Sequence, residues 1–176
     1  PASAVIPRPV HPFPARMAAS IPWNELRRPG TRPLRVLAPM AGSGTTLVVA
    51  RALGHRSIGF DTDPLAVLLA RVWCSDVDAP AVRREAERVR AAASRLACRL
   101  PLRLAYPAEA DDETRAFVRY WFDETNRRQL AVLASLITDI TRRPLRDALW
   151  CAFSRMIITK QAGVSLALDA AHSEGD

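Results

Sequence analysis

A glycine turn followed at a distance by an acidic residue is the pattern in this 176-residue chain that points most directly to chemistry. The apolar run Val36-Leu37-Ala38 leads into the turn Gly42-Ser43-Gly44, and a second apolar run ends at Asp61, 19 residues after Gly42. An acid about 20 residues after such a turn lies at the end of the second strand of a βαβ unit, where its carboxylate can accept both hydroxyls of a ribose. The spacing therefore predicts a site for a cofactor that contains adenosine.

The residues around the turn separate three kinds of nucleotide site. A phosphate-binding P-loop requires a lysine after the second glycine, whereas Gly44 is followed by Thr45. A dinucleotide site requires a third small residue where the helix packs on the strand, and Leu47 stands there. Glycines at 42 and 44 permit close approach of the backbone, and the N–H groups that begin the next helix would meet a carboxylate. S-adenosylmethionine, which carries adenosine and a carboxylate but no diphosphate, fits best.

Three segments of the chain resemble motifs of one enzyme family. Residues 39–46, PMAGSGTT, resemble the glycine motif of the DNA amino-methyltransferases, which methylate adenine N6 or cytosine N4. Residues 59–64, GFDTDP, resemble the second motif of that family, and residues 11–16, HPFPAR, resemble its His-Pro segment beside the cofactor. The motif order is similar to that of members in which the cofactor half precedes the catalytic half. The resemblance covers roughly residues 11–75.

The resemblance implies a set of cofactor-binding residues drawn from all three motifs. They are His11, Phe13, Pro39, Ala41, Gly42, Ser43, Gly44, Thr45, Asp61 and Thr62. Asp61 is the expected ligand of the ribose, and Thr62 is expected to touch the adenine. Asp63 is expected to have another role, because an acid immediately before Pro64 is typical of a helix N-cap with proline at the first helical position.

Two departures from the family pattern concern the chemistry. The residue before the proline of the glycine motif is usually an aspartate that holds the methionine amino group, and here it is Ala38. A hydrogen bond to a charged group is worth on the order of 1.5–3 kcal/mol, so its loss predicts cofactor binding weakened roughly ten- to a hundred-fold. The family's catalytic motif contains Pro-Pro, and this sequence holds no such dipeptide. We therefore assign no catalytic residue and expect that motif beyond residue 176.

The expected fold class is α/β, with a partial Rossmann-like methyltransferase unit of few parallel strands followed by a helical module. Strands are expected over 34–37 and 56–60, with one helix over 45–53 and another starting at Pro64. Gly54 is expected to end the first of these helices as a C-cap. His55 and Trp73 are interpreted as structural residues.

The composition divides the chain into four parts. Residues 1–33 are rich in proline and are expected to form an extended arm that packs on the cofactor site. Residues 34–76 are the cofactor-binding unit, residues 77–160 a helical insertion and residues 161–176 a truncated tail. Within the insertion, Asp78 is expected to cap a helix that ends near Arg99, and further helices are expected over 112–121, 123–141 and 144–159. A loop or short strand is expected over 102–107, and the aromatic residues at 117 and 120–122 are expected to pack between helices.

The charge balance indicates an anionic partner. The chain carries 25 basic and 18 acidic residues, a net charge of +7, and Lys160 is its only lysine. A protein with such a balance is attracted to nucleic acid, although an arginine-rich genome composition would produce the same numbers. DNA is the expected partner, with RNA as the alternative.

Other kinds of site and location find little support in the sequence. Cys74, Cys98 and Cys151 are far apart and form no Cys-x-x-Cys pair, so neither a zinc knuckle nor a disulfide framework is expected, and a reducing cytoplasm suits them. No apolar run approaches the ~20 residues of a membrane-spanning helix, and no signal peptide is visible. We expect a cytoplasmic protein without a metal site or a membrane partner, and we leave its oligomeric state open.

The resemblance implies the S-adenosylmethionine-binding part of a DNA (cytosine-N4 or adenine-N6) methyltransferase of the restriction-modification kind. With the Pro-Pro motif absent, this chain alone is expected to bind the cofactor without turnover. Two alternatives stay open. One is a fragment of an RNA guanine-N2 methyltransferase, whose glycine and aspartate motifs are similar. The other is a non-catalytic remnant that binds nucleic acid through arginine-rich helices.

Overall fold

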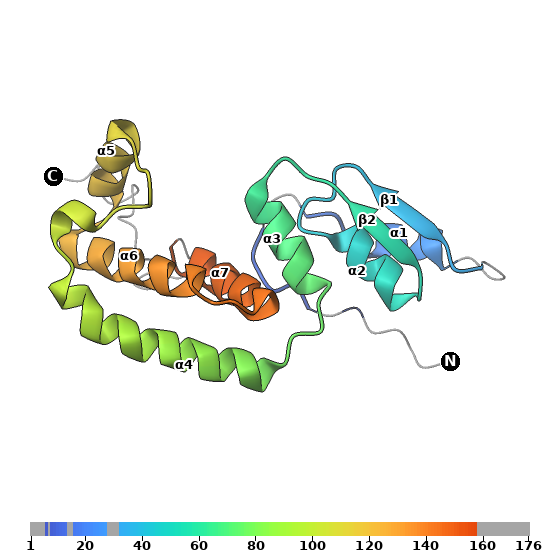
Figure 1. Cartoon of the computed structure of the whole chain (residues 1–176). Coiled ribbons are helices and arrows are strands. Elements are labelled where there is room, and N and C mark those ends of the chain that lie inside the picture. Colours follow the sequence, from blue (N-terminus) through green and yellow to red (C-terminus); the bar gives the residue numbers. More distant parts are fainter. Residues whose placement is uncertain (1–5, 7, 14–15, 28–31, 158–176) are drawn as a thin grey trace, which may run out of the picture. The chain divides into compact units, whose positions relative to one another are not determined.

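A computed structural model describes residues 6, 8–13, 16–27 and 32–157 of the chain. In these residues it contains seven α-helices and one parallel sheet of two strands, and the chain divides into two compact units after Asp76 (Figure 1). The α/β class predicted from the sequence is therefore confirmed. The tail predicted over 161–176 lies outside the described residues.

The first unit is built on a β-α-β segment. Strand β1 (Arg35–Ala38) and strand β2 (Arg56–Gly59) pair in parallel, and helix α2 (Thr45–Ala52) connects them (Figure 1). These bounds confirm the expected elements to within one or two residues. Gly54 follows α2 with a φ of 77°, the left-handed conformation that is typical of a residue just after a helix.

The two faces of this sheet have different surroundings. Alternate residues of a strand point to opposite faces, and Gly59 lies on the face that packs against α2, because a Cβ there would lie 2.8 Å from Leu47 Cδ1. On the opposite face Leu37 is paired with Ile58, and these side chains are 62% and 57% exposed. Helix α2 therefore packs on one face of the sheet, and the other face presents apolar surface.

The core of the first unit joins the proline-rich arm to the β-α-β segment. Val48 and Val49 of α2 are buried together with Trp73, the last residue of α3 (Pro64–Trp73), which confirms the structural role expected for Trp73. Residues of the arm pack against these side chains: Ile6, Val10, Ala19, Trp23 and Leu26. The arm is not extended throughout, because it contains helix α1 (Ser20–Leu26). Pro22 is tolerated there, since the first turn of a helix leaves its N–H groups unbonded in any case.

His55 connects the start of β1 to the end of α1. Its Nδ1 accepts the Leu34 N–H at 3.3 Å, and its Nε2 lies 3.0 Å from the carbonyl oxygen of Leu26. Because Nδ1 is the acceptor, Nε2 carries the proton and donates it to that carbonyl. The structural role expected for His55 is confirmed.

The second unit is helical in the residues described. Its long helices lie where the sequence predicts them: α4 (Ala79–Leu96), α5 (Asp112–Trp121), α6 (Glu124–Thr138) and α7 (Arg143–Ile157). The first three begin with an aspartate whose carboxylate accepts a backbone N–H of the first turn, namely Asp78, Asp111 and Asp123. Residues 97–99 and 102–104 form short 3₁₀ helices, so the strand considered over 102–107 is not formed.

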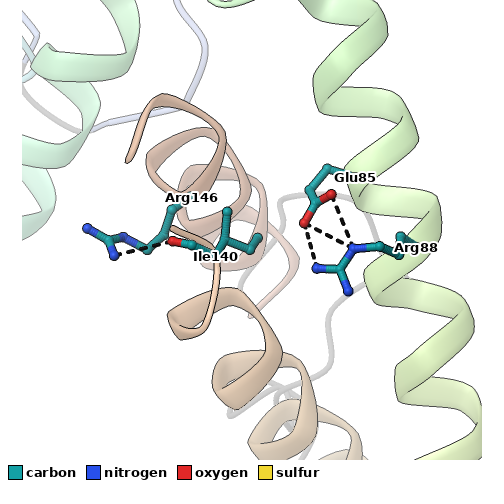
Figure 2. A network of polar contacts seen from close by, with 4 residues as sticks. All are labelled: Glu85, Arg88, Ile140 and Arg146. Atoms are coloured by element: carbon teal, nitrogen blue, oxygen red, sulfur yellow. Dashed lines mark hydrogen bonds and ion pairs between the residues drawn. The ribbon is translucent and has the colours of Figure 1, made fainter. Parts of the chain in front are cut away.

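Helices α4, α6 and α7 enclose a group of buried apolar side chains, namely Val89, Ile137, Ile140, Leu145 and Leu149. Figure 2 shows two polar contacts of this unit. Arg88 Nη2 donates to Glu85 Oε1 at 2.6 Å along α4, and Arg146 Nη1 of α7 donates to the carbonyl oxygen of Ile140 at 3.3 Å. The second contact stabilises the connection between α6 and α7.

The aromatic residues of α5 are not packed between helices, contrary to expectation. Phe117 and Tyr120 are 59% and 66% exposed, whereas Phe122 is buried. The rings of Tyr120 and Phe117 lie on Trp121 instead, with centroids 5.2 and 6.1 Å from its own. No residue of α5 itself is buried, whereas Phe122, just after the helix, is buried as expected.

Candidate functional site

The carboxyl ends of β1 and β2 lie side by side and carry the residues that the motifs single out. Beyond the strands, the Ala41 N–H donates to the carbonyl oxygen of Phe60 at 2.9 Å. The chain then turns through Gly42 and Gly44, with φ values of 52° and 93°, and α2 begins at Thr45. In open parallel sheets, ligands bind in the crevice outside the carboxyl ends of the strands. The glycine turn therefore stands at the end of the sheet where a ligand is expected.

Asp61 joins the glycine turn to the end of β2. Its Oδ2 accepts the N–H of Gly42 at 2.8 Å, and its Oδ1 accepts the N–H of Asp63 at 3.0 Å. These hydrogen bonds hold the pKa of Asp61 below its usual value, because they stabilise the ionised form. The bond from the Asp63 N–H makes the largest contribution, and the bond from the Gly42 N–H comes next. An ionised carboxylate has about four acceptor positions, so two bonds leave capacity for the hydroxyl groups of a ligand.

The two glycines of the turn have different structural roles. A Cβ on Gly44 would lie 2.8 Å from the Cβ of Ala70 and 2.9 Å from its Cα, so only glycine lets α2 begin this close to α3. A Cβ on Gly42 would meet no atom within 4 Å. Gly44 therefore sets the packing of the two helices, and Gly42 keeps the turn open. The contact with Ala70 is one that the sequence analysis missed, and the small size of that residue within an apolar helix was its only signal.

Two buried hydroxyl groups lie in the turn. Ser43 and Thr45 are 7% and 2% exposed, and neither Ser43 Oγ nor Thr45 Oγ1 has a hydrogen-bond partner among the described residues. Buried polar atoms in proteins almost always have a partner, whether protein, water or ligand. The first N–H groups of α2 also lack partners within the helix. The turn therefore combines polar groups that a bound molecule could satisfy.

The proline-rich arm reaches the start of α2. The hydroxyl of Thr46 lies 3.9 Å from Met17 Sδ, and Val10 packs on the core that α2 and α3 share. His11 and Phe13, which stand between these contacts in the sequence, are both half-buried, and the Phe13 N–H donates to the His11 carbonyl oxygen at 2.9 Å. Met17 is a contact that the sequence analysis missed.

The remaining motif residues differ in exposure. Pro39 and Thr62 are exposed, and Ala41 is half-buried. Asp63 is a helix N-cap as expected, since its Oδ1 accepts the Leu65 N–H at 2.8 Å. The side chain of Asp63 is thus engaged with α3, while that of Asp61 faces the glycine turn.

Apolar side chains stand exposed beside the turn. Met40 is 90% exposed and Phe60 is 58% exposed, and Ala38, where the family carries an aspartate, is 7% exposed. Met40 and Phe60 were not singled out from the sequence. Phe60 immediately precedes Asp61, and Met40 precedes the glycine turn. Exposed apolar side chains of this kind can accept a flat base.

Metal and membrane features can be judged for the part of the chain that the structure describes. Among these residues, no cluster of three His, Cys, Asp or Glu side chains could hold a metal ion. Likewise, no described helix has the length and apolar character needed to cross a membrane. Cys74, Cys98 and Cys151 are free thiols.

Comparison with known proteins identifies no relative of the chain. No family model, no curated protein and no solved structure matches it. The assignment of a role to this site therefore depends on the motifs and on the geometry of the glycine turn.

Proposed function

We propose that the first unit is a partial Rossmann-like unit that binds S-adenosylmethionine, and that it is the cofactor part of a DNA methyltransferase acting on cytosine N4 or adenine N6. The observation that supports this most is the bond from the Gly42 N–H to the Asp61 carboxylate, 2.8 Å long. It couples the two motifs that the resemblance pairs, and it orients an ionised acid beside a glycine turn that begins a helix.

Each part of the cofactor has a counterpart in the proposal. Asp61 would accept the ribose hydroxyls, as acids at the end of a second strand do in nucleotide-binding βαβ units. The methionine carboxylate would lie at the start of α2, where the helix dipole favours an anion. The unpartnered hydroxyls of Ser43 and Thr45 support a polar occupant here. Exposed Met40 and Phe60 suit the adenine ring.

The proposed enzyme moves a methyl group from the cofactor to the exocyclic amine of a base turned out of the helix. This sequence contains no Pro-Pro motif to polarise that amine. The chain alone is therefore proposed to bind the cofactor without turnover.

Calorimetric titration with S-adenosylmethionine tests the proposal. The chain should bind saturably, and Asp61→Ala should weaken binding by roughly tenfold or more, since a hydrogen bond to a charged group is lost. Asp63→Ala is the matched control: it removes a carboxylate two residues away that caps α3, so it should lower stability by about 1 kcal/mol and leave the affinity unchanged. A folded chain that does not bind would contradict the proposal, as would equal effects of the two variants.

DNA as the partner is proposed from the charge of +7. Fluorescence anisotropy with duplex DNA and with RNA of equal length, at two salt concentrations, tests it. Binding that falls with added salt and prefers DNA is expected, because neutralised phosphates release counterions. A preference for RNA would favour the guanine-N2 alternative, and nucleic-acid binding without cofactor binding would favour the remnant.

A further inference from the structure

The second unit contains a cavity of about 920 Å³ that the proposed function does not use. It lies among the end of α4, the segment 99–108, the end of α5, α6 and α7. Most of its lining is apolar, and the large side chains are Leu100, Leu104, Phe122, Leu130, Trp150 and Phe153. Sites for small molecules typically measure about 300–1,000 Å³ and combine apolar walls with a few placed polar groups. This cavity is at the upper end of that range.

Arg127 is the buried cation of the lining. Its side chain is 9% exposed, and its Nη1 donates to the hydroxyl of Tyr106 at 2.8 Å. Its Nε is buried without a hydrogen-bond acceptor, and no carboxylate of the described residues pairs with its guanidinium. Burying a charge without an opposite charge is strongly unfavourable. Among the described residues, Arg127 therefore has no anionic group to balance its charge.

Two further arginines, Arg115 and Arg119, contact Tyr106 beside Arg127. The ring of Tyr106, which also lines the cavity, has the guanidinium of Arg115 4.7 Å from its centroid and that of Arg127 5.5 Å away. Arg119 Nη1 reaches the Tyr106 hydroxyl at 3.5 Å. The hydrogen bond from Arg119 and the nearby arginine charges lower the pKa of Tyr106. Three like charges around one ring repel one another, and an anion would relieve that repulsion.

Among the described residues that line the cavity, the only acidic one is remote from this charge. Asp139 follows the end of α6, 12 positions after Arg127, which is about 18 Å along a helix axis. The described lining therefore carries a buried positive charge at Arg127, beside Tyr106, and is otherwise mostly apolar apart from the exposed Arg99.

We propose that this cavity binds a small amphipathic acid, with one carboxylate or sulfonate on Arg127 and an alkyl or aryl body against the apolar lining. A nucleic-acid strand fits less well. Phosphates along a strand are met by exposed cations, whereas Arg127 is nine-tenths buried and the walls around it are apolar.

Titration calorimetry with decanoate and with 1-naphthalenesulfonate tests the proposal on the full chain. At least one of them should bind saturably. Neutral 1-decanol should bind wild type roughly tenfold more weakly than decanoate, since it offers no charge to the guanidinium. Failure of both anions to bind, or equal binding of decanoate and decanol, would overturn the proposal.

Three variants separate the charge from the apolar body. Arg127→Leu should weaken anion binding by roughly tenfold or more, and Ala134→Phe should weaken it by filling the cavity that Ala134 lines. Arg128→Leu removes the same charge from the neighbouring position of α6, outside the cavity, and should leave binding unchanged. Equal affinity of wild type and Arg127→Leu would overturn the proposal.

Thermal melting distinguishes this role from a structural one. If Arg127 only holds Tyr106, Arg127→Leu should melt earlier and bind anions like wild type, and the proposal fails. If Arg127 binds the anion, the melting temperature of Arg127→Leu without ligand should not be lower than that of wild type, because the substitution removes a buried unpaired charge. Displacement of the bound anion by a single-stranded oligonucleotide would overturn the proposal in favour of a nucleic-acid site.

Discussion

The backbone N–H of Gly42 donates to the carboxylate of Asp61 at 2.8 Å, and this bond joins the glycine turn after β1 to the end of β2. The second oxygen of the same carboxylate accepts the Asp63 N–H at 3.0 Å. Asp61 thus has a structural role in the turn, whether or not a ligand is bound. Experiments on this residue must separate its effect on stability from its effect on cofactor affinity.

The pH dependence of stability should report the Asp61 bonds. Hydrogen bonds from the N–H groups of Asp63 and Gly42 lower the pKa of Asp61 below 3.8. A carboxyl group whose folded pKa is lowered stabilises the fold above the unfolded pKa, and this contribution is lost as the pH falls through the folded pKa. Urea unfolding of wild type and Asp61→Asn between pH 6 and pH 2.5 should give a difference that is constant near neutral pH and shrinks in the acid range. A difference that does not change with pH would contradict this prediction.

Replacing each turn glycine by alanine should have unequal effects. Gly44→Ala places a Cβ 2.8 Å from Ala70 Cβ at a φ of 93°, so we expect a loss of about 1–3 kcal/mol from overpacking and about 1 kcal/mol more from the left-handed conformation. Gly42→Ala has the conformational cost alone, about 1 kcal/mol, since its Cβ meets nothing within 4 Å. Chemical unfolding followed by tryptophan fluorescence measures both. Equal losses would show that α2 and α3 are not packed as described.

An aspartate at position 38, as in the DNA amino-methyltransferases that the glycine motif resembles, should strengthen the proposed cofactor binding. Ala38→Asp adds a carboxylate for the methionine amino group and should raise the affinity for S-adenosylmethionine roughly ten- to a hundred-fold. Because Ala38 is buried, the same carboxylate should lower stability without cofactor. Ala38→Asn, nearly equal in size but uncharged, is the control and should gain much less affinity. Calorimetry and thermal melting give the two readouts, and an affinity gain as large in Ala38→Asn would argue against a charged contact.

The three cysteines should differ in their rate of alkylation. Cys98 is exposed, whereas Cys151 is 4% exposed and burial raises the pKa of its thiol. Burial also raises the pKa of Cys74. The thiolate is the reactive form. Iodoacetamide at pH 8 should therefore modify Cys98 first, and the alkylation rate of Cys151 should be lower by roughly tenfold or more. Mass spectrometry of digested samples measures the rates, urea should make them equal, and rapid labelling of Cys151 in the folded chain would contradict the packing of α7.

Much of the secondary structure could be predicted because its signals are local. An aspartate before a helical pattern often marks a helix start, and Asp63 and Asp78 cap helices as expected. Asp111 and Asp123 also cap helices, although the sequence analysis did not single them out as caps. The short helix α1 was missed because prolines on both sides conceal it, although Pro22 is compatible with a first turn. The exposure of Phe117 and Tyr120 was missed because an aromatic residue carries no local mark of which neighbour will cover it.

The motif order and the glycine-to-aspartate spacing were enough to place a β-α-β segment and to name the residues at its carboxyl end. They could not show that the Asp61 carboxylate accepts a hydrogen bond from the Gly42 N–H, that Gly44 packs against Ala70, or that Arg127 is buried beside Tyr106. These pairs stand 19, 26 and 21 positions apart in the chain. Periodicity and capping determine which face of an element is apolar and where it ends, whereas the partner of each side chain is set by how whole elements pack together.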